Sequence, residues 1–404
     1  MKMRTSLLAC LPLLFTAAAV PAQDAATAAR AEWKALIDEN FEHAATQYAH
    51  LLEELENRSG LPRSLRDEAL FTVPPEDWTS GFFPGALWLV FEHTNDPQWR
   101  EAAEDYTQRV ERIQHFTGHH DIGFMLGCSF GEGLRLTGQR EYRDVLLQGA
   151  RSLASRFSPE VGAIRSWDFG SWGYPVIVDN MMNLELLTWA AEESGDESLR
   201  EIAIAHADKT LEHHFREDAS SYHVVDYDPQ TGEPLHKQTA QGYADHTAWA
   251  RGQSWALYGY SMMYRETREP RYLEMAVRIA DFLIHHPNLP ADRIPYWDYD
   301  APDIPDAPRD SSAGAIMCAA LLELSGFVPA EKASDYREVA LAQVRSLSSP
   351  AYRSEPGANG GFILKHGVGH IPEDHEVDVP LIYGDYYFLE ALQRLRDDLA
   401  LTYP

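Results

Sequence analysis

Two aspartates stand where the chain changes from an extended or polar segment to an apolar helical one. Asp121 follows Gly-His-His and precedes Ile-Gly-Phe, and Asp179 follows the β-branched run 176–178. A buried carboxylate is costly to desolvate, so its placement beside a buried helix points to a role beyond packing. Two carboxylates at a sugar site permit hydrolysis, one donating a proton and the other acting as base or stabiliser. We predict that Asp121 and Asp179 form such a pair.

The ionisation of this pair depends on two opposed effects. Asp179 is predicted to be the N-cap of a helix, and both aspartates to lie at a first helical turn, where the helix dipole lowers the pKa of a carboxyl group. Burial beside a second carboxylate raises it, as an acid catalyst requires. The alternative for Asp179 is a purely structural N-cap.

Aromatic residues gather in the same kind of segment. Tryptophan walls with polar tips are suited to sugar rings, because the ring stacks on the aromatic face while hydrogen bonds fix the hydroxyls. Core packing is the alternative for any single tryptophan. Arg251 is a candidate clamp for a carboxylate, since guanidinium offers two parallel donors, and a salt bridge to a nearby aspartate is its alternative. The tryptophans concerned are Trp78, Trp167, Trp172, Trp249 and Trp255.

Six polar or aromatic segments each precede an apolar helix, spaced roughly as two helices plus loops require. The helices between them have one apolar stripe, as at 199–211 and 273–283, which is typical of an outer surface. This alternation predicts an all-α fold, an (α/α)6 toroid of six inner and six outer helices, whose ring closure brings all six segments to one end. An open solenoid is the alternative. The segments begin near Asp77, Gly118, Asp179, Trp249, Arg309 and Glu376.

Other segments complete the expected architecture. Residues 25–56 are predicted to form a helix, and the extended piece 221–227 is predicted to be a loop hairpin. No low-complexity linker interrupts the chain. We therefore predict one catalytic domain over residues 23–404.

The balance of charge limits the possible partners. The 404-residue chain carries 34 basic and 62 acidic residues, a net charge of −28. Such a surface disfavours nucleic acid and anionic membranes, and also a long polyanion held along an open groove. A small anionic substrate in a closed pocket remains compatible with it. Oligomeric state is left open.

Residues 1–22 have the features of a signal peptide. Lys2 and Arg4 precede an apolar run, 7–20, and Val20-Pro-Ala22 supplies small residues for cleavage. The run is too short to span a bilayer, so we expect export, most simply to the periplasm, with cleavage near Ala22. Cleavage would remove both cations and no acid, making the net charge −30. A lipoprotein acylated at Cys10 is the alternative.

Neither cysteine nor histidine patterns predict a cofactor. Only Cys128 and Cys318 remain after export, which allows one disulfide and no cysteine-based metal site. The spacing of His366, His370 and His375 matches no zinc motif. There is no nucleophile elbow and no phosphate-binding loop. We expect no metal and no cofactor.

From about Trp78 to Leu392 the sequence resembles the unsaturated glucuronyl hydrolases of glycoside hydrolase family 88. The resemblance is carried by Trp-Thr-Ser-Gly-Phe-Phe-Pro-Gly, His-Asp-Ile-Gly-Phe, Val-Asp-Asn-Met-Met-Asn-Leu, Tyr-His-Val-Val, Trp-Ala-Arg-Gly-Gln-Ser-Trp, Tyr-Trp-Asp-Tyr-Asp-Ala-Pro and Asp-Val-Pro-Leu-Ile-Tyr-Gly-Asp-Tyr-Tyr. It implies an (α/α)6 barrel. It also implies removal of a 4,5-unsaturated uronic acid, left by polysaccharide lyases, through hydration of its C4=C5 vinyl ether.

The resemblance further implies roles for individual residues. Asp179 matches the family's acid/base aspartate and Asp121 its second aspartate. Ala240 replaces a histidine found in many relatives, which leaves sulfation and linkage preference open. The positions matching substrate contacts are His223, Gln241, Trp249 and Trp255, with Arg251, Trp78 and Trp167 as companions.

Three alternatives to this function differ in the residues they need. Family 105, which acts on unsaturated rhamnogalacturonan products, has a similar barrel and aspartate pair, but His223-Val-Val and the loop 365–370 favour family 88. A non-catalytic sugar-binding toroid would need neither aspartate. A polysaccharide lyase would need a basic cleft, which the net charge disfavours. The parent polysaccharide stays undetermined among chondroitin, hyaluronan, heparin, gellan, xanthan and ulvan.

Overall fold

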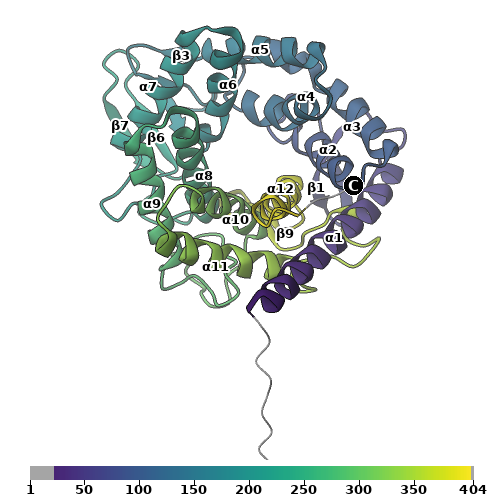
Figure 1. Cartoon of the computed structure of the whole chain (residues 1–404). Helices are drawn as coiled ribbons and strands as arrows, with labels where there is room; N and C mark the ends of the chain where they lie inside the picture. The colour runs from purple at the N-terminus through teal and green to yellow at the C-terminus, as the bar shows by residue number, and fades with distance from the viewer. Residues whose placement is uncertain (1–21, 402–404) are drawn as a thin grey trace, which may run out of the picture.

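The computed structural model describes residues 22–401, and its twelve α-helices form two concentric rings (Figure 1). The predicted (α/α)6 toroid is confirmed, with inner and outer helices alternating along the chain. The inner helices are α2 (Phe82–Thr94), α4 (Glu132–Thr137), α6 (Leu184–Ser194), α8 (Ala250–Thr267), α10 (Ser311–Ser325) and α12 (Ile382–Asp398). The outer helices are α1 (Ala22–Glu54), α3 (Pro97–Arg109), α5 (Arg140–Ala154), α7 (Glu197–His213), α9 (Pro270–Ile284) and α11 (Ala330–Leu347).

Composition explains which helices lie inside. In α10 every residue except Glu323 is buried, and most of its residues are small or aliphatic, so that α8 and α12 pack closely on either side. In the outer helix α9 a single stripe is buried, and Pro270 opens the helix where the absence of its N–H does no harm. The predicted contrast between helices apolar all round and helices apolar on one face is confirmed.

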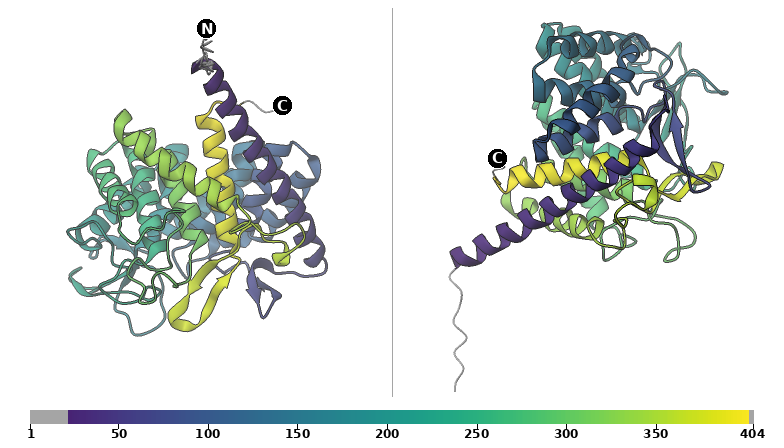
Figure 2. Two further views of the ribbon diagram at one scale, coloured as in Figure 1. Left: turned by 90° about the horizontal axis from the view of Figure 1, so that it is seen from below. Right: turned by 90° about the vertical axis from the view of Figure 1, so that its right-hand side faces the viewer.

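The ring closes through the two ends of the described chain. Successive inner helices contact one another directly or, between α4 and α6, through residues 123–131, and the last of them, α12, packs against the first, α2. The long helix α1, predicted at 25–56, contacts both α2 and α12 across this junction (Figures 1 and 2). Because these contacts join opposite ends of the sequence, the ring is complete only when the whole domain folds.

Two inner helices begin irregularly, beside the aspartates that the sequence singles out. A π-helix, η2 (Gly123–Gly131), precedes α4, and a 3₁₀-helix, η3 (Val178–Asn183), precedes α6. The wider or tighter winding changes the direction of the side chains at the mouth of the ring, and π-helical turns are frequent at functional sites. Other 3₁₀ segments are η1 (Glu111–His115), η4 (Asn359–Gly361) and η5 (Ile371–Glu373).

Short antiparallel sheets decorate the loops. Two hairpins, β1–β2 and β8–β9, project from the same end of the ring and contact each other through β1 and β9 (Figure 2, left). The segment predicted as a hairpin at 221–227 contains the middle strand of a three-stranded sheet. The strands are β1 (Leu61–Arg66), β2 (Ala69–Val73), β3 (Phe157–Ser158), β4 (Ala163–Ile164), β5 (Pro175–Ile177), β6 (Val224–Tyr227), β7 (Pro234–Gln238), β8 (Gly367–His370) and β9 (His375–Val379).

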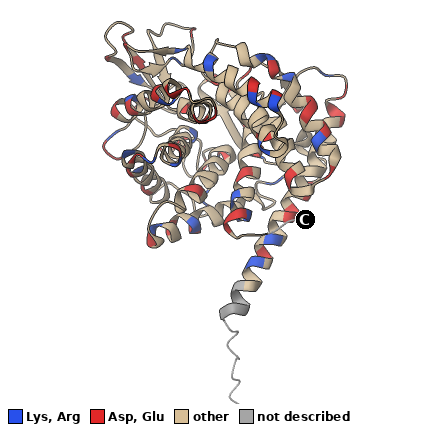
Figure 3. Ribbon diagram, turned by 45° about the horizontal axis from the view of Figure 1, so that its top comes forward, with Lys and Arg blue, Asp and Glu red and all other residues tan. Residues whose placement is uncertain are grey.

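Charged residues of both signs are interspersed over the outer helices and loops (Figure 3). Cys128 and Cys318 are both buried and free, so they do not form the disulfide that the sequence allows. Over residues 22–401 no helix has the length and apolar character needed to cross a bilayer. The predicted signal peptide and the alternative at Cys10 lie outside the described residues.

Candidate active site

A cavity of about 490 Å³ opens at the end of the ring that carries the β1–β2 and β8–β9 hairpins. Most of its lining comes from the segments that precede inner helices, as the sequence predicts. Of the predicted site residues it contains Trp78, Asp121, Trp167, Asp179, His223, Gln241 and Arg251. Its remaining lining is Arg63, Glu76, Asp77, His119, His120, Ser166, Phe169, Trp172, Ile177, Ala240, Gly369, His370, His375, Glu376 and Tyr383.

The two aspartates are brought together by close contact between η2 and η3. A Cβ on Gly123 would lie 2.6 Å from Cα of Asn183, so only glycine fits at this crossing. The Asn183 side chain also accepts a hydrogen bond from the backbone N–H of Phe124 at 2.9 Å. The N-cap prediction for Asp179 is wrong: Ile177 is the N-cap of η3, and Asp179 lies within its first turn.

Asp179 has the ionisation of a neutral acid. Burial is the largest effect and raises its pKa to about 7; Arg251 opposes this shift and Asp121 adds to it. Its Oδ2 atom is buried and makes no hydrogen bond within the described structure. A buried carboxyl oxygen without a protein partner is unfavourable, and is free to exchange a proton with a bound molecule.

His223 faces this free oxygen. Its Nε2 atom, also buried without a partner, lies 3.7 Å from Oδ2 of Asp179, which is longer than a hydrogen bond. Its Nδ1 atom accepts hydrogen bonds from the backbone N–H groups of Ala240 and Gln241, at 3.1 and 3.3 Å. Because Nδ1 is an acceptor and burial lowers the pKa of His223 well below its usual value, the neutral ring carries its proton on Nε2. His223 therefore presents an N–H donor to the site.

Asp121 is held in the opposite state. Burial alone would raise its pKa, but the neighbouring imidazoles outweigh burial and hold it well below the usual range. Nδ1 of His119 and Nε2 of His120 lie 3.1 and 3.2 Å from its two oxygens. Ser166 Oγ accepts from the Ile177 N–H at 2.9 Å and lies 3.3 Å from Nδ1 of His120. The Ser166 hydroxyl can therefore donate its proton to Nδ1 of His120. The ring proton of His120 then lies on Nε2, the nitrogen that faces Asp121.

Arg251 lines the cavity, and the structure places it in the salt bridge that was its alternative interpretation. Its guanidinium is fully buried, and Nη1 lies 3.2 Å from Oδ2 of Asp310. It also donates to the carbonyls of Val368 and Gly369, the latter at 2.7 Å. Arg251 thereby fixes β8 against the inner ring, and Gln241 donates to the same Gly369 carbonyl at 3.0 Å.

Arg63 and Tyr383 belong to the site but are absent from the sequence-based set. Arg63 makes a two-point contact with Glu376 at 2.6 and 2.8 Å and reaches Asp77 at 2.8 Å, which joins both hairpins to the loop before α2. The Tyr383 hydroxyl is buried without a partner, and its ring lies 4.8 Å from Trp78. A lone arginine in a strand carries no sequence signal. Tyr383 lies in a quoted family motif, which could have identified it.

Of the five tryptophans that the sequence singles out, three line the cavity, namely Trp78, Trp167 and Trp172. Trp255 does not: it is fully buried between Phe124 and Tyr387, so its prediction as a cavity wall is wrong. Trp249 is also outside the lining. Its ring packs against two residues that do line the cavity, 4.4 Å from the His223 ring and 4.6 Å from the Arg251 guanidinium. Spacing alone could not distinguish the face of α8 that turns into the core.

The C-terminal histidines have separate partners. His366 pairs with Asp378 at 2.6 Å, His370 lies 2.8 Å from the Ala240 carbonyl, and His375 is 3.0 Å from Arg66. Among residues 22–401 no three or more His, Cys, Asp or Glu side chains are placed to share a metal ion.

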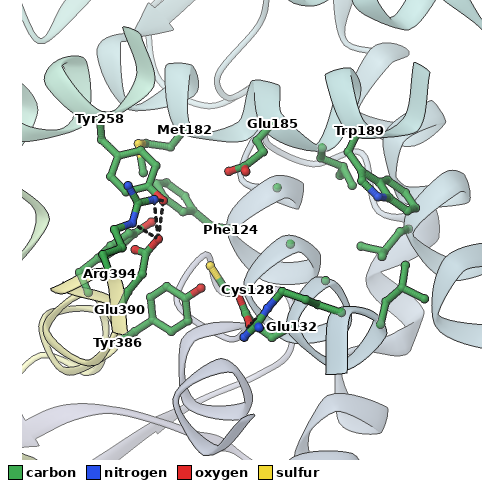
Figure 4. Close-up of a pocket in the computed structure, with 18 residues that line it drawn as sticks. Phe124, Cys128, Glu132, Met182, Glu185, Trp189, Tyr258, Tyr386, Glu390 and Arg394 are labelled. Atoms are coloured by element: carbon green, nitrogen blue, oxygen red, sulfur yellow. Dashed lines mark hydrogen bonds and ion pairs between the residues drawn. The ribbon is translucent and has the colours of Figure 1, made fainter. Parts of the chain in front are cut away.

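A second cavity, of about 450 Å³, lies between the later turns of the inner helices (Figure 4). It too is lined by acids, arginines and aromatic rings. Arg394 donates to Tyr258 at 2.6 Å and to Glu390 at 2.8 Å, and Glu132 pairs with Arg135 at 2.6 Å. Glu390, like Asp179, has one buried oxygen without a partner, but its other oxygen pairs with Arg394, whereas no arginine of the described residues is in contact with Asp179.

Comparison with known proteins gives matches to one enzyme family. The sequence profile described as Glycosyl Hydrolase Family 88 matches residues 63–349. An unsaturated glucuronyl hydrolase of Formosa agariphila is 46% identical over 341 residues, 83% of this chain and 84% of the relative. An unsaturated chondroitin disaccharide hydrolase of Streptococcus pneumoniae is 34% identical, covering 80% of this chain and 83% of its own. A crystal structure of an unsaturated glucuronyl hydrolase specific for heparin superposes with a TM-score of 0.87 at 42% identity, covering 91% of this chain and 98% of that chain.

Proposed function

This chain belongs to Glycosyl Hydrolase Family 88, and on that premise we propose which of its residues perform the reaction and on which products it acts. It is a glycosidase that removes the 4,5-unsaturated uronic acid from the non-reducing end of lyase-generated oligosaccharides. Its substrate is accordingly a small unsaturated saccharide.

Asp179 is the acid and base of the proposed mechanism. Because its pKa is raised to about 7, a large fraction of the molecules hold this proton near neutral pH, and Asp179 donates it to C4 of the vinyl ether. The resulting carboxylate takes a proton from the water whose oxygen bonds to C5. His223, whose Nε2 lies 3.7 Å from Oδ2 of Asp179, donates toward this carboxylate. The hemiketal formed at C5 opens, and the bond to the neighbouring sugar breaks.

Asp121 has the second role in this proposal. Because His119 and His120 keep it ionised, it cannot be the proton donor. A fixed negative charge beside the C4–C5 bond stabilises the positive charge that develops at C5 when C4 is protonated. It also helps to keep Asp179 protonated before the reaction begins.

The observation that carries this assignment is the pair of unlike carboxyl groups in one cavity, one neutral and one ionised. The test is to follow the ultraviolet absorbance of the C4=C5 bond in an unsaturated disaccharide mixed with the purified protein. We expect the absorbance to disappear as the uronic acid is released. Turnover of a saturated glucuronide with no loss from the unsaturated one would contradict the proposal.

We propose that the preferred substrates are lyase products of the heparin type that carry no sulfate group. Both arginines in the cavity lining are already paired, Arg63 with Glu376 and Asp77, and Arg251 with Asp310, so neither is free to bind a sulfate group. The structure described as specific for heparin is 42% identical, whereas the chondroitin disaccharide hydrolase is 34% identical. In a panel of lyase products, we expect kcat/KM to be highest for the unsulfated heparin-type disaccharide. Equal turnover of its sulfated or chondroitin-type counterparts would overturn this preference.

Export and independence from metal complete the proposal. The signal-like residues 1–22 support cleavage near Ala22 and release to the periplasm. Mass spectrometry of protein from the native cell should find an N-terminus near Gln23; an intact Met1 or a lipid on Cys10 would contradict export as a soluble protein. Treatment with EDTA should leave activity unchanged. A loss of activity that added zinc restores would make His366, His370 and His375 candidate metal ligands.

A further inference from the structure

The loop 165–174 forms one wall of the catalytic cavity and carries three aromatic residues that the proposed reaction does not use. Trp167, Phe169 and Trp172 all line the cavity. Phe169 is 71% exposed, the highest value among the large apolar side chains of residues 22–401. Trp167 and Trp172 are half-buried, so the wall becomes more open from its inner tryptophans to Phe169.

The three rings are arranged as a continuous surface. The planes of Trp167 and Phe169 are within 15° of parallel, with centroids 5.4 Å apart. Trp172 stands at 80° to Trp167, with centroids 5.8 Å apart. Parallel, offset rings present a stepped apolar face, and the perpendicular ring gives that face an edge. The apolar C–H face of a pyranose is complementary to such a surface.

The base of this loop is anchored by charge. Asp168, between two of the aromatic residues, lies 2.9 Å from Nη1 of Arg156 and 3.2 Å from Nε of Arg165. Arg165 also donates to the Trp167 carbonyl at 3.0 Å. Gly170 has a φ of +78°, and a Cβ there would lie 2.9 Å from the Trp172 ring. The rings are therefore held in position although their faces are exposed, and a preorganised surface binds with less loss of entropy.

From these observations we propose that Trp167, Phe169 and Trp172 form an outer saccharide subsite, which binds a neutral pyranose ring farther toward the reducing end than the sugar next to the released uronic acid. The inference rests on the proposed function, because the uronic acid must occupy the inner part of the cavity beside Asp121 and Asp179. A longer oligosaccharide then leaves the cavity past Phe169. The ring bound there is neutral, because the nearby cations Arg156 and Arg165 already share Asp168.

The test compares an unsaturated disaccharide with the unsaturated tetrasaccharide of the same unsulfated polymer. Phe169→Ala should lower kcat/KM for the tetrasaccharide by about threefold to tenfold, through KM, and leave the disaccharide unchanged. Phe169→Tyr should keep the preference of the parent protein. Leu235→Ala is the matched control, since Leu235 is 50% exposed but lies on β7 outside the cavity lining.

Two results would overturn the subsite. One is an unchanged ratio of tetrasaccharide to disaccharide kcat/KM in Phe169→Ala; the other is an equal loss for both substrates, which would mean that Phe169 only shapes the cavity. Binding of both saccharides to Asp179→Asn by calorimetry gives the same comparison without turnover. If the parent protein fails to consume either saccharide, the proposed function fails instead, so the two failures are distinguishable.

Discussion

The two cavities of this toroid are nearly equal in size, about 490 and 450 Å³, and both are lined by acids, arginines and aromatic rings, although only the catalytic one of the two also contains histidines. In the cavity of Figure 4, Arg394 pairs with Glu390. Two residues outside its lining complete the pairing, since Glu323 contacts Arg394 and Arg265 contacts Glu185. In the catalytic cavity, Asp179 has no arginine in contact and an unpartnered oxygen, and faces an unpartnered nitrogen of His223. Volume does not separate the two cavities; the histidines of the catalytic cavity and the pairing of the carboxylates with arginines do.

The difference has a physical basis in what a buried charge requires. An arginine in contact with a carboxylate keeps it ionised and satisfied, which stabilises the fold but removes its capacity to exchange protons. A carboxyl group buried without a cation in contact becomes neutral near pH 7 and can act as an acid. The cavity of Figure 4 therefore stabilises the fold, whereas the catalytic cavity can transfer protons. Variants on the two sides should separate stability from catalysis.

The largest effect is expected from Asp179→Asn. Asparagine keeps the shape of the side chain but cannot donate or accept the reacting proton, so kcat should fall by ~10²–10⁴-fold while substrate still binds. Glu185→Gln, in the cavity of Figure 4, is the matched change and should leave kcat within about twofold, because no reacting group contacts it. A residual kcat within tenfold of the parent protein would remove Asp179 from the role of acid.

The next effect concerns Arg251, the buried arginine of the catalytic cavity. Arg251→Lys keeps the positive charge near Asp310 but loses the planar fork that also binds the Val368 and Gly369 carbonyls. The strand β8 should then be less well fixed, and kcat/KM should fall by more than tenfold, with truncation typically costing ~2–5 kcal/mol. Steady-state kinetics on the unsulfated disaccharide measures this fall in kcat/KM. An unchanged kcat/KM would show that Arg251 is only structural, like its counterparts in the other cavity.

A smaller effect is the dependence of activity on pH. The acid form of Asp179 is the active one, and its pKa is raised to about 7, so kcat/KM should be level below this value and fall about tenfold per pH unit above it. Asp121 stays ionised throughout this range and should contribute no acidic limb. The profile is measured at constant ionic strength. A midpoint near the usual pKa of aspartate would mean that burial does not control this group.

The fold was accessible from the sequence because its signals are periodic. Helices apolar all round alternate with helices apolar on one face, and this alternation identifies inner and outer helices before any contact is known. Asp121 and Asp179 were accessible for a related reason, since each stands immediately before a buried helix. The placement of Asp179 within η3 was not, because a 3₁₀ turn and an N-cap share the same short sequence pattern.

The rest of the site depends on contacts between distant segments. Arg63 and Glu376 are more than three hundred residues apart and pair only because the ring closes. Trp255 looks equivalent to Trp249 in sequence, and only the packing of α8 against Phe124 and Tyr387 turns it into the core. Pattern identifies which elements form, whereas the direction of a single side chain follows from the elements it meets.

The smallest effect on activity, and the sharpest test of the comparison, is expected from Arg394→Met. Arg394 is buried among Glu323, Glu390 and Tyr258, so methionine fills much of its volume but leaves Glu390 without its cation, and Glu323 with Arg265 alone. The free energy of unfolding should fall by roughly 3–5 kcal/mol, visible as a lower Tm in a thermal scan. The kcat/KM of the folded protein should stay within about twofold of the parent, because no atom of this network contacts the catalytic cavity. A large fall in kcat/KM at a temperature where the variant is fully folded would show that the two cavities are coupled, and that pairing of carboxylates does not by itself separate structure from chemistry.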